Sequence, residues 1–168
     1  MARDVVDEIV AEWEAMRPDL DAEPIGMVGR ISRLSRLIDR RLGENFARFD
    51  IEDWMYDVLA TLYRGGPPHA ATPGELVQRT MVTTGAITNR VDRLVGLGLV
   101  ERRPSETDRR SIVVSLTPAG IAKVEQVAPE HLALERALLS VLSPSARRAL
   151  AASLRRLLID LGDTAGDM

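Results

Sequence analysis

Residues 72–120 read TPGELVQRTMVTTGAITNRVDRLVGLGLVERRPSETDRRSIVVSLTPAG, and this stretch decides the fold. Its first part carries the signals of a helix start. Thr72 offers a side-chain oxygen that can cap a helix, and Pro73 suits the first turn. Glu75 holds the reciprocal position of a capping box. The sequence therefore predicts a short helix over residues 74–80.

A second helix is predicted from Thr84 to Leu97, after a turn at 81–83. Gly98 follows, and glycine commonly ends a helix because it adopts the left-handed conformation without strain. Apolar side chains recur on one face of this segment at helical spacing. They form an expected buried stripe of Ile87, Val91, Leu94 and Val95.

Two predicted strands around a basic loop complete the stretch. The strands are expected over residues 99–103 and 111–116. The loop between them, 104–110, is polar and ends in two arginines. A helix, a turn, a second helix and a basic hairpin, in this order, are typical of a winged helix-turn-helix. The alternative is a small α+β unit with a solvated charged loop.

The distribution of charge favours the winged helix. Residues 79–110 contain seven arginines and four acidic residues, a local net charge of +3, whereas the whole chain carries −3 and the remainder −6. Positive charge is therefore concentrated on the one element shaped to enter DNA. A winged helix that binds proteins is the alternative from a different class. It would need neither this local charge nor the basic wing, and DNA binding at varied salt concentration separates the two.

Short hydrogen-bonding side chains and arginines are what base edges and phosphates accept. From the second helix and the turn before it, we expect DNA contacts by Thr83, Thr84, Thr88, Asn89 and Arg93. From the wing, we expect them by Arg103, Asp108, Arg109 and Arg110. In the wing, Arg110 is expected to reach the minor groove, and Asp108 to hold its guanidinium in place.

The chain resembles the MarR family of bacterial transcription regulators. Four segments carry the resemblance, in matching order and spacing: 87–95, 98–102, 108–110 and 116–120. The resemblance implies a mainly α fold, in which a winged helix-turn-helix with a two-stranded β wing joins a helical dimerisation lobe. It also implies a homodimer, built by both chain ends, that binds a palindromic operator, as a repressor. Small aromatic anions are expected to relieve DNA binding from a site between the dimer helices and the winged lobe.

The helix before Pro18 resembles an extension found in the urate-responsive subgroup of that family. The ligand set of that subgroup is one Trp, one Asp and two Arg, which correspond here to Trp13, Asp57, Arg90 and Arg102. An indole can stack on a flat purine, arginines can neutralise its charge, and a carboxylate can accept from ring N–H groups. The alternative is structural: Trp13 in the core, Asp57 paired with Arg90, and Arg102 on a phosphate.

Further helices are expected on both sides of the winged unit, over residues 4–17, 25–48, 51–63, 117–139 and 143–161. Pro129 should kink or split the fourth of these. The second should bury an inner stripe of Ile31, Leu34, Ile38, Leu42 and Phe46. We expect dimerisation segments at 1–50 and 118–168 around a DNA-binding lobe at 51–117. Surplus apolar surface on the terminal helices favours a dimer, with Leu154 and Leu158 as interface candidates, over a monomer whose ends cover each other.

Composition excludes several other classes of protein. There is no cysteine, and the two histidines are far apart in the sequence, so we expect neither a disulfide nor a metal site. No nucleophile-and-base set and no phosphate-binding glycine loop is present, which predicts a protein that is not an enzyme and has no cofactor. No apolar run approaches the length of a membrane span, and no signal-peptide pattern is found. A cytoplasmic protein without a membrane partner is expected.

Overall fold

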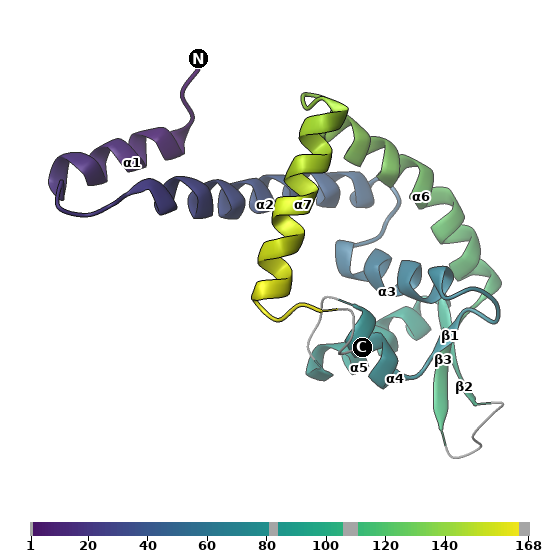
Figure 1. The fold of residues 1–168 in the computed structure, drawn as a ribbon. Helices are drawn as coiled ribbons and strands as arrows, with labels where there is room; N and C mark the ends of the chain where they lie inside the picture. The colour runs from purple at the N-terminus through teal and green to yellow at the C-terminus, as the bar shows by residue number, and fades with distance from the viewer. Residues whose placement is uncertain (1, 81–83, 106–110, 165–168) are drawn as a thin grey trace. The chain divides into compact units, whose positions relative to one another are not determined.

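The computed structural model describes residues 2–80, 84–105 and 111–164 (Figure 1). The chain forms two compact units, Met1–Gly43 and Glu44–Met168. The first consists of helix α1 (Val5–Met16) and most of helix α2 (Glu23–Ala47). The second contains, in chain order, α3 (Asp53–Arg64), β1 (Ala70–Ala71), α4 (Pro73–Arg79), α5 (Thr84–Gly96), β2 (Val100–Pro104), β3 (Ile112–Leu116), α6 (Pro118–Leu138) and α7 (Pro144–Asp160).

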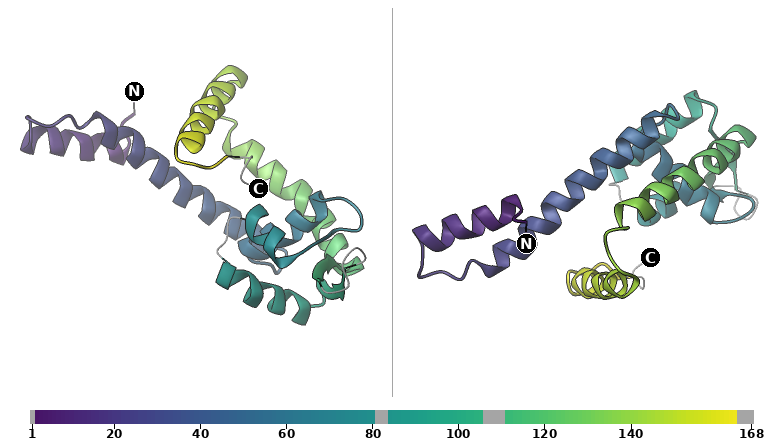
Figure 2. Two further views of the ribbon diagram at one scale, coloured as in Figure 1. Left: turned by 60° about the horizontal axis from the view of Figure 1, so that its bottom comes forward. Right: turned by 90° about the horizontal axis from the view of Figure 1, so that it is seen from above.

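The N-terminal unit is a helical hairpin in which α1 folds back along the start of α2 (Figure 2). Asp4 caps α1, because its Oδ1 accepts from the backbone N–H of Val6 at 2.9 Å. In return, the Asp7 carboxylate accepts from the Asp4 N–H at 2.8 Å. Arg30 of α2 then joins both carboxylates, with Nε 2.8 Å from Asp4 and one terminal nitrogen 2.6 Å from Asp7. The predicted first helix is confirmed, and its capping residues also fasten it to α2.

The packing between α1 and α2 depends on a small residue. Val6 is buried against Gly29, where an added Cβ would lie 3.3 Å from the valine side chain. The predicted inner stripe of α2 is only partly correct. Phe46 is buried in the second unit, but Ile31 and Leu34 are exposed, because α1 covers α2 on the face that carries the glycines. Helical spacing predicts a shared face but cannot say whether the same chain covers it.

The sheet has three antiparallel strands in the order β1-β3-β2. The hairpin pairs Val100 with Leu116 and Arg103 with Val113, as the sequence predicted for a wing. The third strand, β1, pairs Ala70 with Ser115 on the other edge of β3. The wing has the two predicted strands, and β1 adds a third strand to the sheet that the sequence analysis did not predict. A two-residue Ala-Ala strand has no periodicity, so only the position of its partner reveals it.

The core of the second unit forms where α3, α5 and the sheet meet. Val58, Leu59 and Leu62 of α3 are almost fully buried, and so are the α5 side chains Ile87, Val91 and Leu94. Val95 was also predicted to be buried, but it is 38% exposed. It follows Ile87 by eight residues, so at about 100° per residue it lies about 80° round the helix, at the edge of the stripe.

Pro129 was predicted to kink or split helix α6; the helix is continuous through Pro129, so it is not split. Val124 and Val127 are buried just before the proline and hold this part of the helix against α3. A ring cluster of Phe46, Tyr56 and His131 joins α2, α3 and α6, with ring centroids 4.9–5.2 Å apart. The packing on both sides of Pro129 keeps the helix whole. No helix within the described residues is long and apolar enough to cross a bilayer.

The start of α6 packs tightly against the end of α5. Thr117 caps α6 by accepting from the Gly120 N–H at 3.1 Å, and its hydroxyl donates to the carbonyl of Gly98 at 2.7 Å. Gly120 lies directly against the next carbonyl, that of Leu99. An added Cβ would come within 2.0 Å of that oxygen.

We therefore expect Gly120→Ala to lower the free energy of unfolding by about 3 kcal/mol or more, because two backbone segments would have to move apart. Urea unfolding at fixed protein concentration measures the change. Gly96→Ala is the matched control, because no atom lies within 4 Å of its added Cβ. That variant should remain within about 1 kcal/mol of the parent. Equal stability of the two variants would contradict the close packing at Gly120.

Candidate nucleic-acid interface

Helix α4 begins with the predicted capping box. The Thr72 hydroxyl accepts from the Glu75 N–H at 3.2 Å, and the Glu75 carboxylate accepts from the Thr72 N–H at 2.7 Å. The Thr72 N–H and hydroxyl both donate to the Glu75 carboxylate and hold its pKa below the usual value, so the carboxylate stays ionised and keeps its capping role at neutral pH. The first turn of α4 is thus fixed by two side chains that the sequence had marked.

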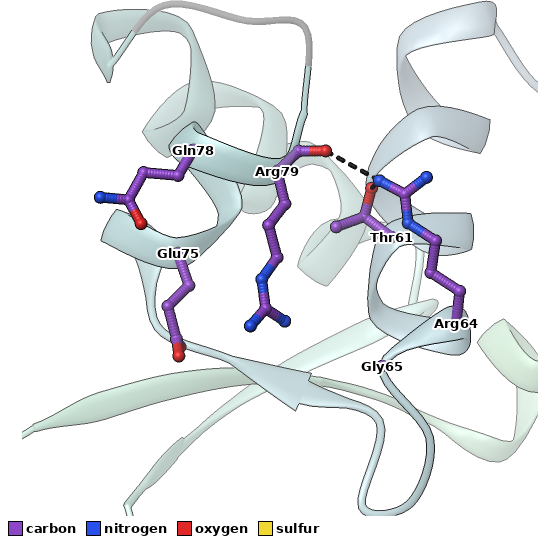
Figure 3. Close-up of a pocket in the computed structure, with 6 residues that line it drawn as sticks. All are labelled: Thr61, Arg64, Gly65, Glu75, Gln78 and Arg79. Atoms are coloured by element: carbon purple, nitrogen blue, oxygen red, sulfur yellow. Dashed lines mark hydrogen bonds between the residues drawn. The ribbon is translucent and has the colours of Figure 1, made fainter. Parts of the chain in front are cut away.

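The other end of α4 is held by α3, through a contact that the sequence did not reveal. The Arg64 guanidinium donates to the Arg79 carbonyl at 2.8 Å and to the Thr61 hydroxyl at 3.1 Å (Figure 3). Cations stabilise the unpaired carbonyls at a helix C-terminus. Arg64 therefore fastens the last turn of α4 just before the turn of the helix-turn-helix. The side chains around it line a hollow of about 720 Å³, formed by Thr61, Arg64, Gly65, Glu75, Gln78 and Arg79.

Helix α5 presents the proposed base-reading side chains on the face opposite its buried stripe. Thr88, Asn89 and Arg93 are exposed, and Asn89 and Arg93 lie about 160° and 120° from Ile87 round the helix. Thr84 is the first residue of α5. Thr83 lies outside the described residues. Burial of one stripe on α3 thus leaves a polar face of α5 turned outward.

The wing is described in part. Arg103 is a half-buried residue of β2, and Ser105 donates its N–H to the Ser111 carbonyl at 2.8 Å, which continues the hairpin past β2. Asp108, Arg109 and Arg110, which were predicted to contact DNA, lie outside the described residues. Within the described part of the chain, no group of three or more His, Asp or Glu side chains is arranged to hold a metal ion.

Three of the four predicted ligand residues lie in the second unit. Asp57 is half-buried on α3 and Arg90 is half-buried on α5. The Arg90 guanidinium lies 5.5 Å from the ring centre of Trp54, in a cation–π contact. Arg102 on β2 forms an ion pair with Asp92 at 2.5 Å, and both side chains are partly exposed. Trp13 is 46% exposed on α1, in the N-terminal unit. Within this chain, Trp13 is therefore not a buried core residue.

Sequence reasoning missed a cluster at the start of α3. In the structure the Glu52 carboxylate accepts from the Trp54 indole N–H at 2.8 Å and from Arg93 at 2.6 Å. Arg93 lies 41 positions after Glu52 in the sequence, and no spacing rule connects the two residues.

The fold and the outward polar face of α5 are those of a winged-helix DNA-binding protein. Comparison with known proteins identifies the type. The model of the MarR family matches residues 49–111. The transcriptional regulator PecS of Dickeya dadantii is 41% identical over 151 residues, which cover 90% of this chain and 91% of that protein. The chain belongs to the MarR family of DNA-binding transcriptional regulators.

Solved structures agree with this assignment. A mutant of MarR from Escherichia coli, in complex with operator DNA, superposes with a TM-score of 0.71 at 29% identity, and the match covers 93% of this chain and 99% of that one. AbsC, a MarR family regulator from Streptomyces coelicolor, gives a TM-score of 0.77 at 23% identity over 86% of this chain and 97% of that one. The predicted family and winged-helix fold are confirmed, and these relatives are regulators rather than enzymes.

Proposed function

We propose that this regulator is a homodimeric repressor that binds a palindromic operator and is released from it by a small aromatic anion, of which urate is the leading candidate. The observation that carries the DNA-binding part is the outward face of α5. It combines Thr88, Asn89 and Arg93 with a rigid attachment of the helix through its buried stripe. A helix held in this way can enter the major groove as a fixed unit.

DNA contacts divide by role in this proposal. Thr83, Thr84, Thr88 and Asn89 meet base edges, and Arg93 and Arg103 meet bases or phosphates. Arg110 reaches the flanking minor groove with Arg109 beside it, and Asp108 orients its guanidinium. A related MarR from Escherichia coli has been solved in complex with operator DNA, which supports DNA binding by this fold.

Helix α7 supports the dimer. Its residues are all described and none of them is buried. Apolar side chains repeat on one face of it at helical spacing, with exposed fractions between 38% and 50%: Leu150, Leu154, Leu157 and Leu158. A helix with such an apolar face gains free energy by burying it against a second copy. In a dimer, two copies of α5 can then meet successive major grooves, about 34 Å apart on one face of the duplex.

The ligand site is proposed at Trp13, Asp57, Arg90 and Arg102, the set taken over from the urate-responsive subgroup. Both arginines already have partners that an anion could replace. Arg102 pairs with Asp92 at the surface, and exposed pairs of this kind contribute only about 0–1 kcal/mol. Arg90 lies over Trp54 on the helix that meets DNA. An anion that recruits Arg90 therefore acts directly on the position of α5, and its effect is set by its difference in affinity for the two positions.

The DNA contact is tested by comparing two variants. Asn89→Ala should lower affinity about 5- to 150-fold for a duplex that the wild-type protein selects from a random pool, because a base contact is lost. The affinity of Asn89→Ala for an unselected duplex should change little.

Arg110→Ala should instead weaken binding to both the selected and the unselected duplex, and it should reduce the salt dependence of the affinity by about one phosphate contact. Fluorescence anisotropy titrations measure both effects. Gln126→Ala, an exposed change on α6, serves as the control. If Asn89→Ala binds the selected duplex as the parent does, α5 does not read bases.

The dimer interface is tested on α7. Leu154→Glu with Leu158→Glu should yield monomers by light scattering, because two carboxylates would be buried in an apolar contact at a cost of several kcal/mol. Ala152→Glu with Arg156→Gln changes the net charge equally and is the control. These two positions lie about 160° from Leu154 round the helix, and the variant should remain dimeric. A dimeric Leu154→Glu, Leu158→Glu variant that still binds DNA would exclude this interface.

The ligand is tested by calorimetry with urate and by operator binding with and without it. Saturating urate should lower DNA affinity roughly 5- to 150-fold, the usual range of allosteric coupling. Trp13→Ala should bind DNA normally and lose most of this response, whereas Trp13→Phe, which keeps an aromatic ring, should retain part of it. No heat of binding at millimolar urate, together with an unchanged response in Trp13→Ala, would remove urate and this site from the proposal.

A further inference from the structure

Glu52 precedes α3 at the N-cap position, but its side chain does not cap the helix. Glu52 has the extended backbone of an N-cap, with φ −97° and ψ 157°, yet among the described residues its side chain bonds to no amide of α3. Glutamate is a poor N-cap, because its longer side chain does not return easily to the first amides. Its two carboxylate oxygens instead accept from different partners: Oε2 from the Trp54 indole at 2.8 Å, and Oε1 from Arg93 at 2.6 Å.

Trp54 holds the arginine from a second side. The Arg93 guanidinium lies 4.7 Å from the centre of the indole ring, and that of Arg90, one turn earlier on α5, lies 5.5 Å from it. Cation–π contacts of this length are attractive. Arg93 is thus placed by both a carboxylate and an aromatic face, and Trp54 orients that carboxylate through its N–H.

This arrangement occupies an arginine of the DNA-facing helix with a negative charge. The hydrogen bonds from Trp54 and Arg93 lower the pKa of Glu52, so the carboxylate is ionised at neutral pH. The side chains of Arg93 and Glu52 are 58% and 53% exposed. An ion pair this exposed is weak, because water screens it and both side chains lose freedom in forming it. Arg93 can therefore exchange this partner for another anion at little cost.

We infer that Glu52 competes with a DNA phosphate for Arg93 and thereby limits the affinity of this regulator for DNA. The inference rests on the proposed contact between α5 and DNA. When Arg93 turns to a phosphate, Glu52 is left a few ångströms from that phosphate, and the two negative charges repel. Trp54 keeps the arginine within reach of both anions. Glu52 is thus a positioning residue with a negative effect on binding.

The test is Glu52→Gln, which keeps the size of the side chain and an acceptor for the indole but removes the charge. Two unit charges 4 Å apart in water change an equilibrium constant about fivefold. We expect Glu52→Gln to bind the selected duplex about fivefold more tightly, and its affinity to fall more steeply with salt, by about one phosphate contact.

Two further variants isolate the mechanism. Asp53→Asn removes a neighbouring charge that pairs with no cation among the described residues, and it should change affinity less than Glu52→Gln. In an Arg93→Gln background, the effect of Glu52→Gln should shrink to about twofold or less, the scatter usual for independent substitutions. This loss would show that Glu52 acts through Arg93.

Three results would overturn the inference alone: Glu52→Gln with unchanged or weaker binding, an equal gain in Asp53→Asn, or a gain that persists without Arg93. The first would mean that Arg93 keeps its Glu52 partner on DNA, and the other two would indicate a general charge effect. A wild-type protein that selects no duplex from the pool would overturn the proposed function and this inference with it.

Discussion

The orientation of the DNA-facing surface depends on the burial of three side chains, Ile87, Val91 and Leu94, against α3 and the sheet. A helix has one orientation about its own axis, so fixing the buried stripe also fixes the opposite face. Burial of three such side chains contributes several kcal/mol, far more than any single polar contact on the helix surface. The core therefore holds the polar residues of α5 outward, where we propose that they meet DNA, and these residues need no contacts of their own to stay there.

Weak electrostatic contacts at the surface then hold the positive groups that the core has placed. Three arginines of α5 and β2 contact side chains from outside their own element: Arg93 contacts Glu52, Arg90 contacts Trp54, and Arg102 contacts Asp92. Each of these contacts is at least partly exposed and can be exchanged. The core thus sets where the positive groups are, and weak surface pairs set how readily each one is available to another anion.

The sequence predicted the elements of the winged unit well because their signals are local. The capping box at Thr72, the helix end at Gly98 and the hairpin all depend on residues that are close together in the sequence. The failures have a different origin. Val95 lies at the edge of a stripe whose width depends on the neighbouring helix, and β1 is defined only by its partner strand. The contacts of Arg64 with Arg79 and of Glu52 with Arg93 join separate helices, and periodicity carries no information about such pairs.

The junction between α5 and the wing has a mechanical consequence. Gly98 turns the chain with φ +70°, and the Thr117 hydroxyl and amide bind the carbonyls of Gly98 and Leu99. These bonds join the start of α6 directly to the segment where α5 ends and β2 begins. A shift of the first turn of α6 must therefore either break these bonds or carry the end of α5 and the start of β2 with it.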